Sequence, residues 1–100
     1  MAKFEIRWSE EAYRGMHEAC EYLERHESSW NAQMLAEVLE GIEKLRELPR
    51  LGSRFLSSDD ANKRVLTTRH FQIIYLLVEE EGIVHLATIR HQRQGSPPYE

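Results

Sequence analysis

Two apolar runs separated by an acidic turn constrain the fold of this chain more than any other feature of its sequence. The first run is Phe71–Val78, the second is Ile83–Ile89, and the acidic turn between them ends in Gly82. Apolar runs joined by so short a glycine-containing turn are typical of an antiparallel β-hairpin. Because the first run is apolar on both faces, it predicts a central strand that helices cover on one side. The second run leads directly into the sequence RHQR of residues 90–93, so the hairpin should display cationic and titratable side chains where it ends.

The N-terminal half of the chain predicts one strand and two helices. Residues 3–8 alternate between polar and apolar side chains, which is the pattern of a half-buried strand. Ser9 then offers a helix N-cap, and apolar residues recur at three- and four-residue steps over about residues 10–26. A second apolar stripe runs from Met34 to Leu48, and the proline and glycine that follow are expected to end this helix. The short break between the two helices predicts an antiparallel helical hairpin.

The order of these elements predicts an α+β fold. Residues 49–62 are rich in Gly, Pro, Ser, Asp and Asn and predict a loop, and Lys63–Thr68 is a β-branched strand before the hairpin. The order is therefore β-α-α-β-β-β, with the last three strands in an antiparallel meander and the first strand beside the last. The helical hairpin can bury its stripe only by packing on this mostly antiparallel four-stranded sheet. We expect a single domain over residues 1–94 and a loose C-terminal tail at residues 95–100, where two prolines prevent a strand.

The charges are distributed unevenly along the chain. The net charge of −4 argues against strong nonspecific binding of nucleic acid, which depends on neutralising phosphates. Residues 1–48 hold eleven acids and six Lys or Arg, whereas residues 49–100 hold six acids and seven Lys or Arg. The C-terminal half therefore offers a mild basic patch that could meet an anionic partner locally. The glutamates of the two helices are interpreted as a solubilising surface (Glu18, Glu21, Glu37, Glu40, Glu43 and Glu47).

Several functional classes find no support in the sequence. No apolar run is long enough to cross a bilayer, and the N-terminus lacks the apolar centre of a secretory signal. The one cysteine, Cys20, falls among the apolar positions of the first helix and is interpreted as a small core residue. No set of His, Cys, Asp and Glu has the spacing of a metal site, and no glycine-rich phosphate loop is present. These features predict a cytoplasmic protein without a metal, a cofactor or a membrane partner.

The candidate site lies at the exit of the hairpin. Its charged members are four arginines and one histidine: Arg64, Arg69, Arg90, His91 and Arg93. An imidazole can move a proton near neutral pH, and guanidinium groups can hold an anion or stabilise developing charge. Arg64 and Arg69 lie at the two ends of a predicted strand that is two strands away from the exit of the hairpin. Their long side chains could therefore reach the same face of the sheet as the residues of the exit. Otherwise the exit is a solvated strand end. Tyr75 could add its hydroxyl to this patch, or it could pack in the core with its hydroxyl at the rim.

The element order together with the closing residues resembles the RelE/ParE superfamily of toxins from type II toxin–antitoxin systems. The resemblance extends over about residues 3–94 and is carried by the order and spacing of four segments. The second helix ends in LRELPRLGSR, and an Arg-Val-Leu strand follows at residues 64–66. The next strand reads FQIIY at residues 71–75, and the chain closes with IRHQRQ at residues 89–94.

The resemblance implies a growth-inhibiting toxin that a cognate antitoxin neutralises by wrapping its sheet and helical face. ParE-like members of the superfamily poison DNA gyrase, whereas RelE-like members cleave messenger RNA on the ribosome with basic residues and a Tyr or His. Gln72 stands where the family carries a strand arginine, and this chain is acidic where ribosome-directed members are strongly basic. The HQRQ ending and the long helical hairpin are closer to ParE. We therefore expect a ParE-like gyrase inhibitor, which is not an enzyme.

The candidate residues have different roles under the alternative hypotheses. In a ParE-like inhibitor, the residues expected to contact protein partners are Arg64, Arg69, Tyr75, Arg90 and Arg93. In a RelE-like mRNA endonuclease, His91 would deprotonate the 2′-hydroxyl, and Arg64, Arg90 and Arg93 would stabilise the phosphorane. A third hypothesis is a non-toxic binding module that keeps the toxin fold. Exposed sheet edges make a homodimer, or strand addition by the antitoxin, compatible with all three.

Overall fold

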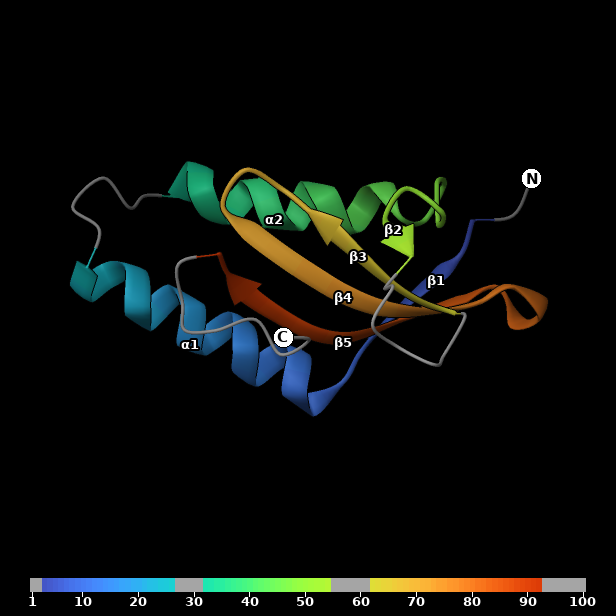
Figure 1. Cartoon of the computed structure of the whole chain (residues 1–100), viewed down its shortest axis with the longest axis horizontal. Helices are drawn as coiled ribbons and strands as arrows, with labels where there is room; N and C mark the ends of the chain where they lie inside the picture. The colour runs from blue at the N-terminus through green and yellow to red at the C-terminus, as the bar shows by residue number, and fades with distance from the viewer. Residues whose placement is uncertain (1–2, 27–31, 55–61, 93–100) are drawn as a thin grey trace.

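The computed structural model describes residues 3–26, 32–54 and 62–92. Figure 1 shows two helices and a twisted sheet, whose long strands appear between the two helices in this view. The elements in chain order are β1 (Glu5–Trp8), α1 (Glu10–His26), α2 (Ala32–Lys44), β2 (Ser53–Arg54), β3 (Lys63–Thr67), β4 (Phe71–Val78), the short 3₁₀ helix η1 (Glu79–Glu81) and β5 (Ile83–His91). Within the described ranges, no helix is both long and apolar enough to cross a membrane.

The strands form one sheet in the order β1-β5-β4-β3-β2. β5, β4, β3 and β2 are antiparallel neighbours, and β1 runs parallel to β5. The predicted meander and the predicted place of the first strand beside the last are both confirmed. The predicted strand number was one too low, because Ser53–Arg54 pairs with β3 inside the segment predicted as a loop. Composition could not reveal this strand, because two residues among turn-forming neighbours form a strand only where they can pair with the edge of a sheet, here with β3.

The second helix ends earlier than its apolar stripe indicated. α2 stops at Lys44, and the chain continues in tight turns, in which the backbone N of Leu45 donates to the carbonyl of Ile42 at 3.0 Å. Leu45 is fully buried, whereas Leu48 is 56% exposed. The apolar spacing continues beyond the end of the helix because Leu45 is buried in the core although it lies in a turn.

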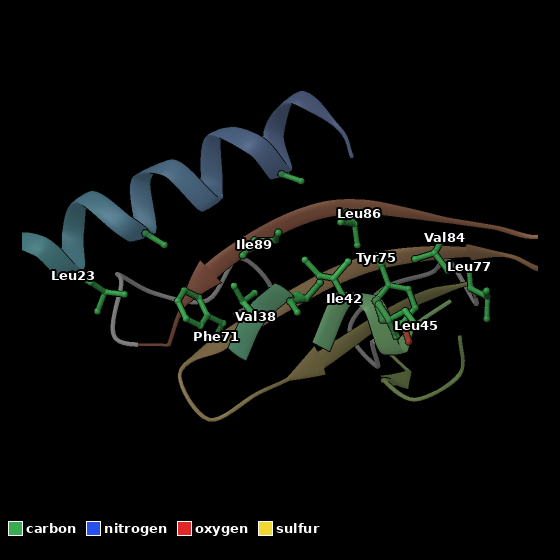
Figure 2. Packing of buried hydrophobic residues seen from close by; sticks show 13 residues of the cluster. Leu23, Val38, Ile42, Leu45, Phe71, Tyr75, Leu77, Val84, Leu86 and Ile89 are labelled. Atoms are coloured by element: carbon green, nitrogen blue, oxygen red, sulfur yellow. The ribbon is translucent and has the colours of Figure 1, made fainter. Parts of the chain in front are cut away.

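Both helices contribute to one core that packs against β4 and β5 (Figure 2). Alternate residues of β4 enter this core, which confirms that helices cover the central strand on one side. The buried members of the cluster are Ala12, Ala19 and Leu23 of α1, Val38 and Ile42 of α2, Leu45, and the strand residues Phe71, Ile73, Tyr75, Leu77, Val84, Leu86 and Ile89.

α1 approaches the backbone of β5 closely. A Cβ atom on Gly15 would overlap the carbonyl oxygen of Ile89, so only glycine allows this approach. At the start of the helix, the Ser9 hydroxyl donates to the carbonyl of Ala87 at 3.1 Å. These contacts position the second half of β5, and with it the end of the strand where the candidate site was predicted.

Candidate functional site

His91 lies at the end of β5, on the face of the sheet that packs against the helices. It pairs across the sheet with Phe71, whose ring meets the His91 ring edge-on at a centroid distance of 5.6 Å. The rings of Tyr22 on α1 and His70 before β4 lie 6.0 and 6.2 Å from the His91 ring. Only 3% of His91 is exposed. His91 is therefore a packed residue between the sheet and the helices, with little surface on which a substrate could bind.

Arg90 lies on the opposite face of the sheet from His91. Neighbouring residues of a strand point to opposite faces, and Arg90 pairs with Gln72 whereas His91 pairs with Phe71. The side chains of Arg90 and His91 thus leave the strand on different faces of the sheet. Arg93 lies outside the described residues.

Tyr75 and Arg64 hold the segment that follows α2 against the sheet. The Tyr75 hydroxyl donates to the carbonyl of Pro49 at 2.8 Å and accepts from the backbone N of Gly52 at 2.9 Å. Nη1 of Arg64 donates to the carbonyl of Gly52 at 2.5 Å and to that of Arg50 at 3.3 Å. Tyr75 is fully buried, and this burial raises the pKa of its hydroxyl. Of the two predicted roles of Tyr75, the structure shows the one in which the ring packs in the core. Its hydroxyl is hydrogen-bonded to backbone groups of the protein.

The predicted convergence of the arginines does not occur among the described residues. Arg64 pairs with Tyr75, which lies four residues along β4 from Phe71, the partner of His91. At the rise of a β-strand this separation is about 13 Å. Arg64 is also bonded to the carbonyls of another segment, so its guanidinium is not available at the exit of the hairpin.

A hydrogen-bonded cluster that the sequence did not predict lies beside His91. Glu37 of α2 reaches the turn between β3 and β4, where its Oε2 accepts from the Thr68 hydroxyl at 2.8 Å and from the backbone N of His70 at 2.9 Å. Its Oε1 lies 3.0 Å from Nδ1 of His70. The interpretation of Glu37 as a solubilising residue was therefore wrong. No periodic signal could have found this contact, because it joins residues 33 positions apart.

Gln92, which follows the end of β5, is hydrogen-bonded to the same turn. Its Nε2 donates to the carbonyl of Thr68 at 2.6 Å and to that of Arg69 at 3.3 Å, and its backbone N donates to the carbonyl of His70 at 2.9 Å. Within the turn, the backbone N of Thr68 donates to the carbonyl of Phe71 at 2.8 Å. We call residues 68–71, held by Glu37 and Gln92, the braced turn. It brings α2, β4 and the end of β5 together.

Arg69 is the exposed residue of the braced turn. In the part of the chain that the structure describes, its side chain makes no hydrogen bond and no ion pair. Arg69 is thus the member of the predicted site that offers an unengaged cation at the end of the sheet.

The partners of Glu37 keep it ionised. Burial by itself raises the pKa of a carboxyl, but the hydrogen bonds from the Thr68 hydroxyl and from the amide and ring of His70 outweigh it, and the pKa of Glu37 is lowered. An ionised carboxylate beside an imidazole orients the ring and can support proton transfer by it. Among the residues that the structure describes, no group of three or more His, Cys, Asp and Glu side chains could hold a metal ion.

Glu37→Gln is expected to lower the stability at neutral pH by about 1–3 kcal/mol, because hydrogen bonds to a half-buried carboxylate are lost or weakened. The pKa of Glu37 lies below its ordinary value of 4.5 in the folded protein. The ionised carboxylate therefore stabilises the fold above that value, and this contribution is lost as the pH falls through the folded pKa. Urea unfolding of both proteins between about pH 7 and pH 3 should show the difference shrinking with acid. A difference that stays constant over this range would contradict the assignment.

The sequence also matches a known family over almost its whole length. The family model described as "ParE toxin of type II toxin-antitoxin system, parDE" matches residues 6–95. This chain belongs to the ParE toxin family. The membership in the RelE/ParE superfamily predicted from the sequence is thereby confirmed. No curated protein matches the sequence of this ParE-family toxin with significance.

Solved structures share the fold of this ParE-family toxin at low sequence identity. A chain of the RelBE2 toxin–antitoxin complex from Mycobacterium tuberculosis has a TM-score of 0.68 and 18% identity, covering 90% of this chain and 99% of that one. A chain of the chromosomal ParDE system from P. aeruginosa has a TM-score of 0.68 and 13% identity, covering 89% and 96%. A mutant of the E. coli toxin RelE in the free state has a TM-score of 0.63 and 13% identity, covering 90% and 83%. These likenesses establish the RelE/ParE-like α+β fold, and they include both RelE and ParE systems.

Proposed function

We propose that this ParE-family protein inhibits growth by binding DNA gyrase, and that a cognate antitoxin neutralises it. The observation that carries the choice of gyrase is the dispersal of those predicted RNA-cleaving residues that the structure describes. His91 is 3% exposed on the helical side of the sheet, Arg90 is on the other side, and Arg64 is bonded to the segment after α2. The match to the ParE family over residues 6–95 supports the same choice.

Cleavage of RNA has a geometric requirement that these residues do not meet. The base that deprotonates the 2′-hydroxyl and the cations that stabilise the phosphorane must reach the same phosphodiester group. A protein that inhibits an enzyme by binding it needs only a complementary surface. The net charge of −4 also favours a protein target over an RNA-rich one.

The proposed antitoxin partner is supported by the structural neighbours, since the RelBE2 chain comes from a solved toxin–antitoxin complex. The outer strands of the sheet, β1 and β2, are edges to which an antitoxin strand or a second copy of the chain could add. Gyrase and the ribosome are both cytoplasmic, so we propose that the protein acts in the cytoplasm.

Purified protein is expected to inhibit supercoiling by DNA gyrase and to accumulate complexes of gyrase with cleaved DNA. The reason is that a bound inhibitor of this class traps the enzyme with its DNA. The measurement is a supercoiling assay with and without the protein, read on agarose gels. If concentrations that arrest growth leave gyrase unaffected, the proposed function is wrong.

A RelE-like mRNA endonuclease is the second candidate, and the pairing of Glu37 with His70 favours it. A carboxylate 3.0 Å from Nδ1 orients the imidazole, as in carboxylate–histidine pairs that act in general base catalysis. Primer extension on messenger RNA from expressing cells should then show cuts that disappear in His70→Ala, or in His91→Ala if the residue predicted from sequence is the base. Uncut transcripts in growth-arrested cells exclude this function. Unimpaired growth after strong induction without antitoxin would instead support the non-toxic binding module.

A further inference from the structure

The braced turn is held from two sides by side chains of other elements. Glu37 binds the Thr68 hydroxyl and the amide and ring of His70, and Gln92 binds the carbonyls of Thr68 and Arg69 through its side chain. Exposed turns commonly leave such groups to water and are more mobile than the elements that they connect. Because this turn is ordered before any partner arrives, a side chain on it can bind with a smaller loss of conformational entropy.

Arg69 is the cation that this turn presents. Three other arginines, the exposed Arg7 and Arg50 and the half-buried Arg46, each pair with a glutamate of the protein. Arg69 makes no side-chain hydrogen bond or ion pair within the described ranges. Arg14 and Arg25 on α1 and Arg54 on β2 are also exposed and, within the same ranges, also without such a bond, but none of these three lies on a turn that side chains of other elements hold as Glu37 and Gln92 hold residues 68–71. Arg69 therefore combines an unengaged guanidinium with a preorganised backbone.

We propose that Arg69, on the braced turn, binds a carboxylate on an acidic surface of DNA gyrase. The inference rests on the proposed function and adds the residue through which the target is held. The planar fork of a guanidinium matches the two oxygens of a carboxylate and can bind both at once. A phosphate would fit the same fork, but the acidic chain lacks the excess of positive charge that nucleic-acid binding requires. The partner chemistry is therefore an Asp or Glu of a protein.

Arg69→Ala tests the proposal in the gyrase supercoiling assay. The half-inhibitory concentration should rise about tenfold or more, because a buried interface arginine is often a hot spot of binding. Arg69→Lys should lose an intermediate amount of inhibition, since lysine keeps the charge but not the fork. Arg54→Ala is the matched control and should change the half-inhibitory concentration by less than about twofold. The melting temperatures of these variants should stay near that of the unchanged protein, because each removes an exposed side chain.

A double-mutant cycle of Glu37 and Arg69 tests how much Glu37 contributes to target binding by holding the braced turn. Glu37→Gln should weaken inhibition by about threefold while Arg69 is present, because a looser turn presents the guanidinium less rigidly. In the Arg69→Ala background the same substitution should have no further effect on inhibition. If Glu37 serves only folding, Glu37→Gln will weaken inhibition by the same factor in both backgrounds. That result would overturn the role of the braced turn in presenting Arg69.

The outcomes separate this inference from the proposed function. If the unchanged protein inhibits gyrase and Arg69→Ala inhibits it equally well, the role of Arg69 is overturned while the function stands. If the unchanged protein does not inhibit gyrase, the function fails, and Arg69 is tested by growth arrest on induction, which does not depend on knowing the target. In that case the gyrase contact is overturned with the function; loss of arrest in Arg69→Ala but not in Arg54→Ala would assign Arg69 to the contact with another target, and unchanged arrest would overturn any role of Arg69 in target binding. Binding of RNA or DNA that depends on Arg69 in a gel-shift assay would overturn the assignment to a protein carboxylate.

Discussion

Tyr75→Ala is expected to lower the free energy of unfolding by about 3–5 kcal/mol, a large fraction of the stability of a domain of this size. Tyr75 is the largest of the fully buried side chains in the described part of the chain. It packs in the core with residues of both helices (Figure 2), and its hydroxyl joins the carbonyl of Pro49 to the amide of Gly52. Alanine at this position leaves a cavity, and it leaves the buried backbone amide of Gly52 without a hydrogen-bond partner. Urea denaturation followed by circular dichroism measures the loss.

Tyr75→Phe is the control that separates packing from hydrogen bonding. The ring stays in the core, so the expected loss is about 1–3 kcal/mol for the unpaired groups of Pro49 and Gly52. If Tyr75→Phe is as stable as the unchanged protein, the hydroxyl does not hold the segment after α2. If Tyr75→Ala is also nearly as stable, the placement of Tyr75 in the core is contradicted.

Ile74→Ala is expected to destabilise the fold by about 2–5 kcal/mol through the cavity that it leaves. Ile74 lies in the central strand between Val65 of β3 and Thr88 of β5, and only 3% of it is exposed. Its burial is separate from the core cluster, to which Ile73 contributes from the other face of the same strand. Equilibrium unfolding in urea, with the same slope against denaturant for both proteins, gives the difference directly.

Leu76→Ala is the matched control for Ile74. Leu76 lies two residues further along β4 on the same face, pairs with Lys63 and His85, and is only half-buried. Its loss should therefore be smaller, about 1 kcal/mol. Equal losses at the two positions would mean that burial does not decide their contributions, and near-unchanged stability of Ile74→Ala would contradict the central place of β4.

Most of the fold could be predicted because its signals are local and periodic. The apolar stripes of the helices, the alternation of β1 and the two runs of the hairpin each repeat with the period of their element, so type and order were visible in the sequence. The place of β1 beside β5 followed from the connection rules that govern neighbouring strands, and the structure adds that the two run parallel. The two errors, β2 and the end of α2, fall where a short segment takes its conformation from the element beside it rather than from its own residues.

The candidate site could be predicted only in part. The sequence predicts a site at the end of β5, but alternation along the strand places Arg90 and His91 on different faces, and Arg64 pairs with Tyr75, four residues along β4 from the partner of His91. The sequence predicts a solvated position for Glu37 and gives no signal for His70, because their contact depends on how α2 lies over the turn between β3 and β4.

The sequence by itself determined the α+β element order, the central hairpin and the membership in the RelE/ParE superfamily, because each rests on patterns that run along the chain. Only the tertiary structure decided which charged side chains meet. It buried His91, engaged Tyr75 and Arg64 with the segment after α2, and left Arg69 exposed on a turn held by Glu37 and Gln92. The physical reason is that hydrogen bonds and ion pairs act over a few ångströms. Which partners come that close depends on the packing of helices on the sheet and not on spacing in the sequence.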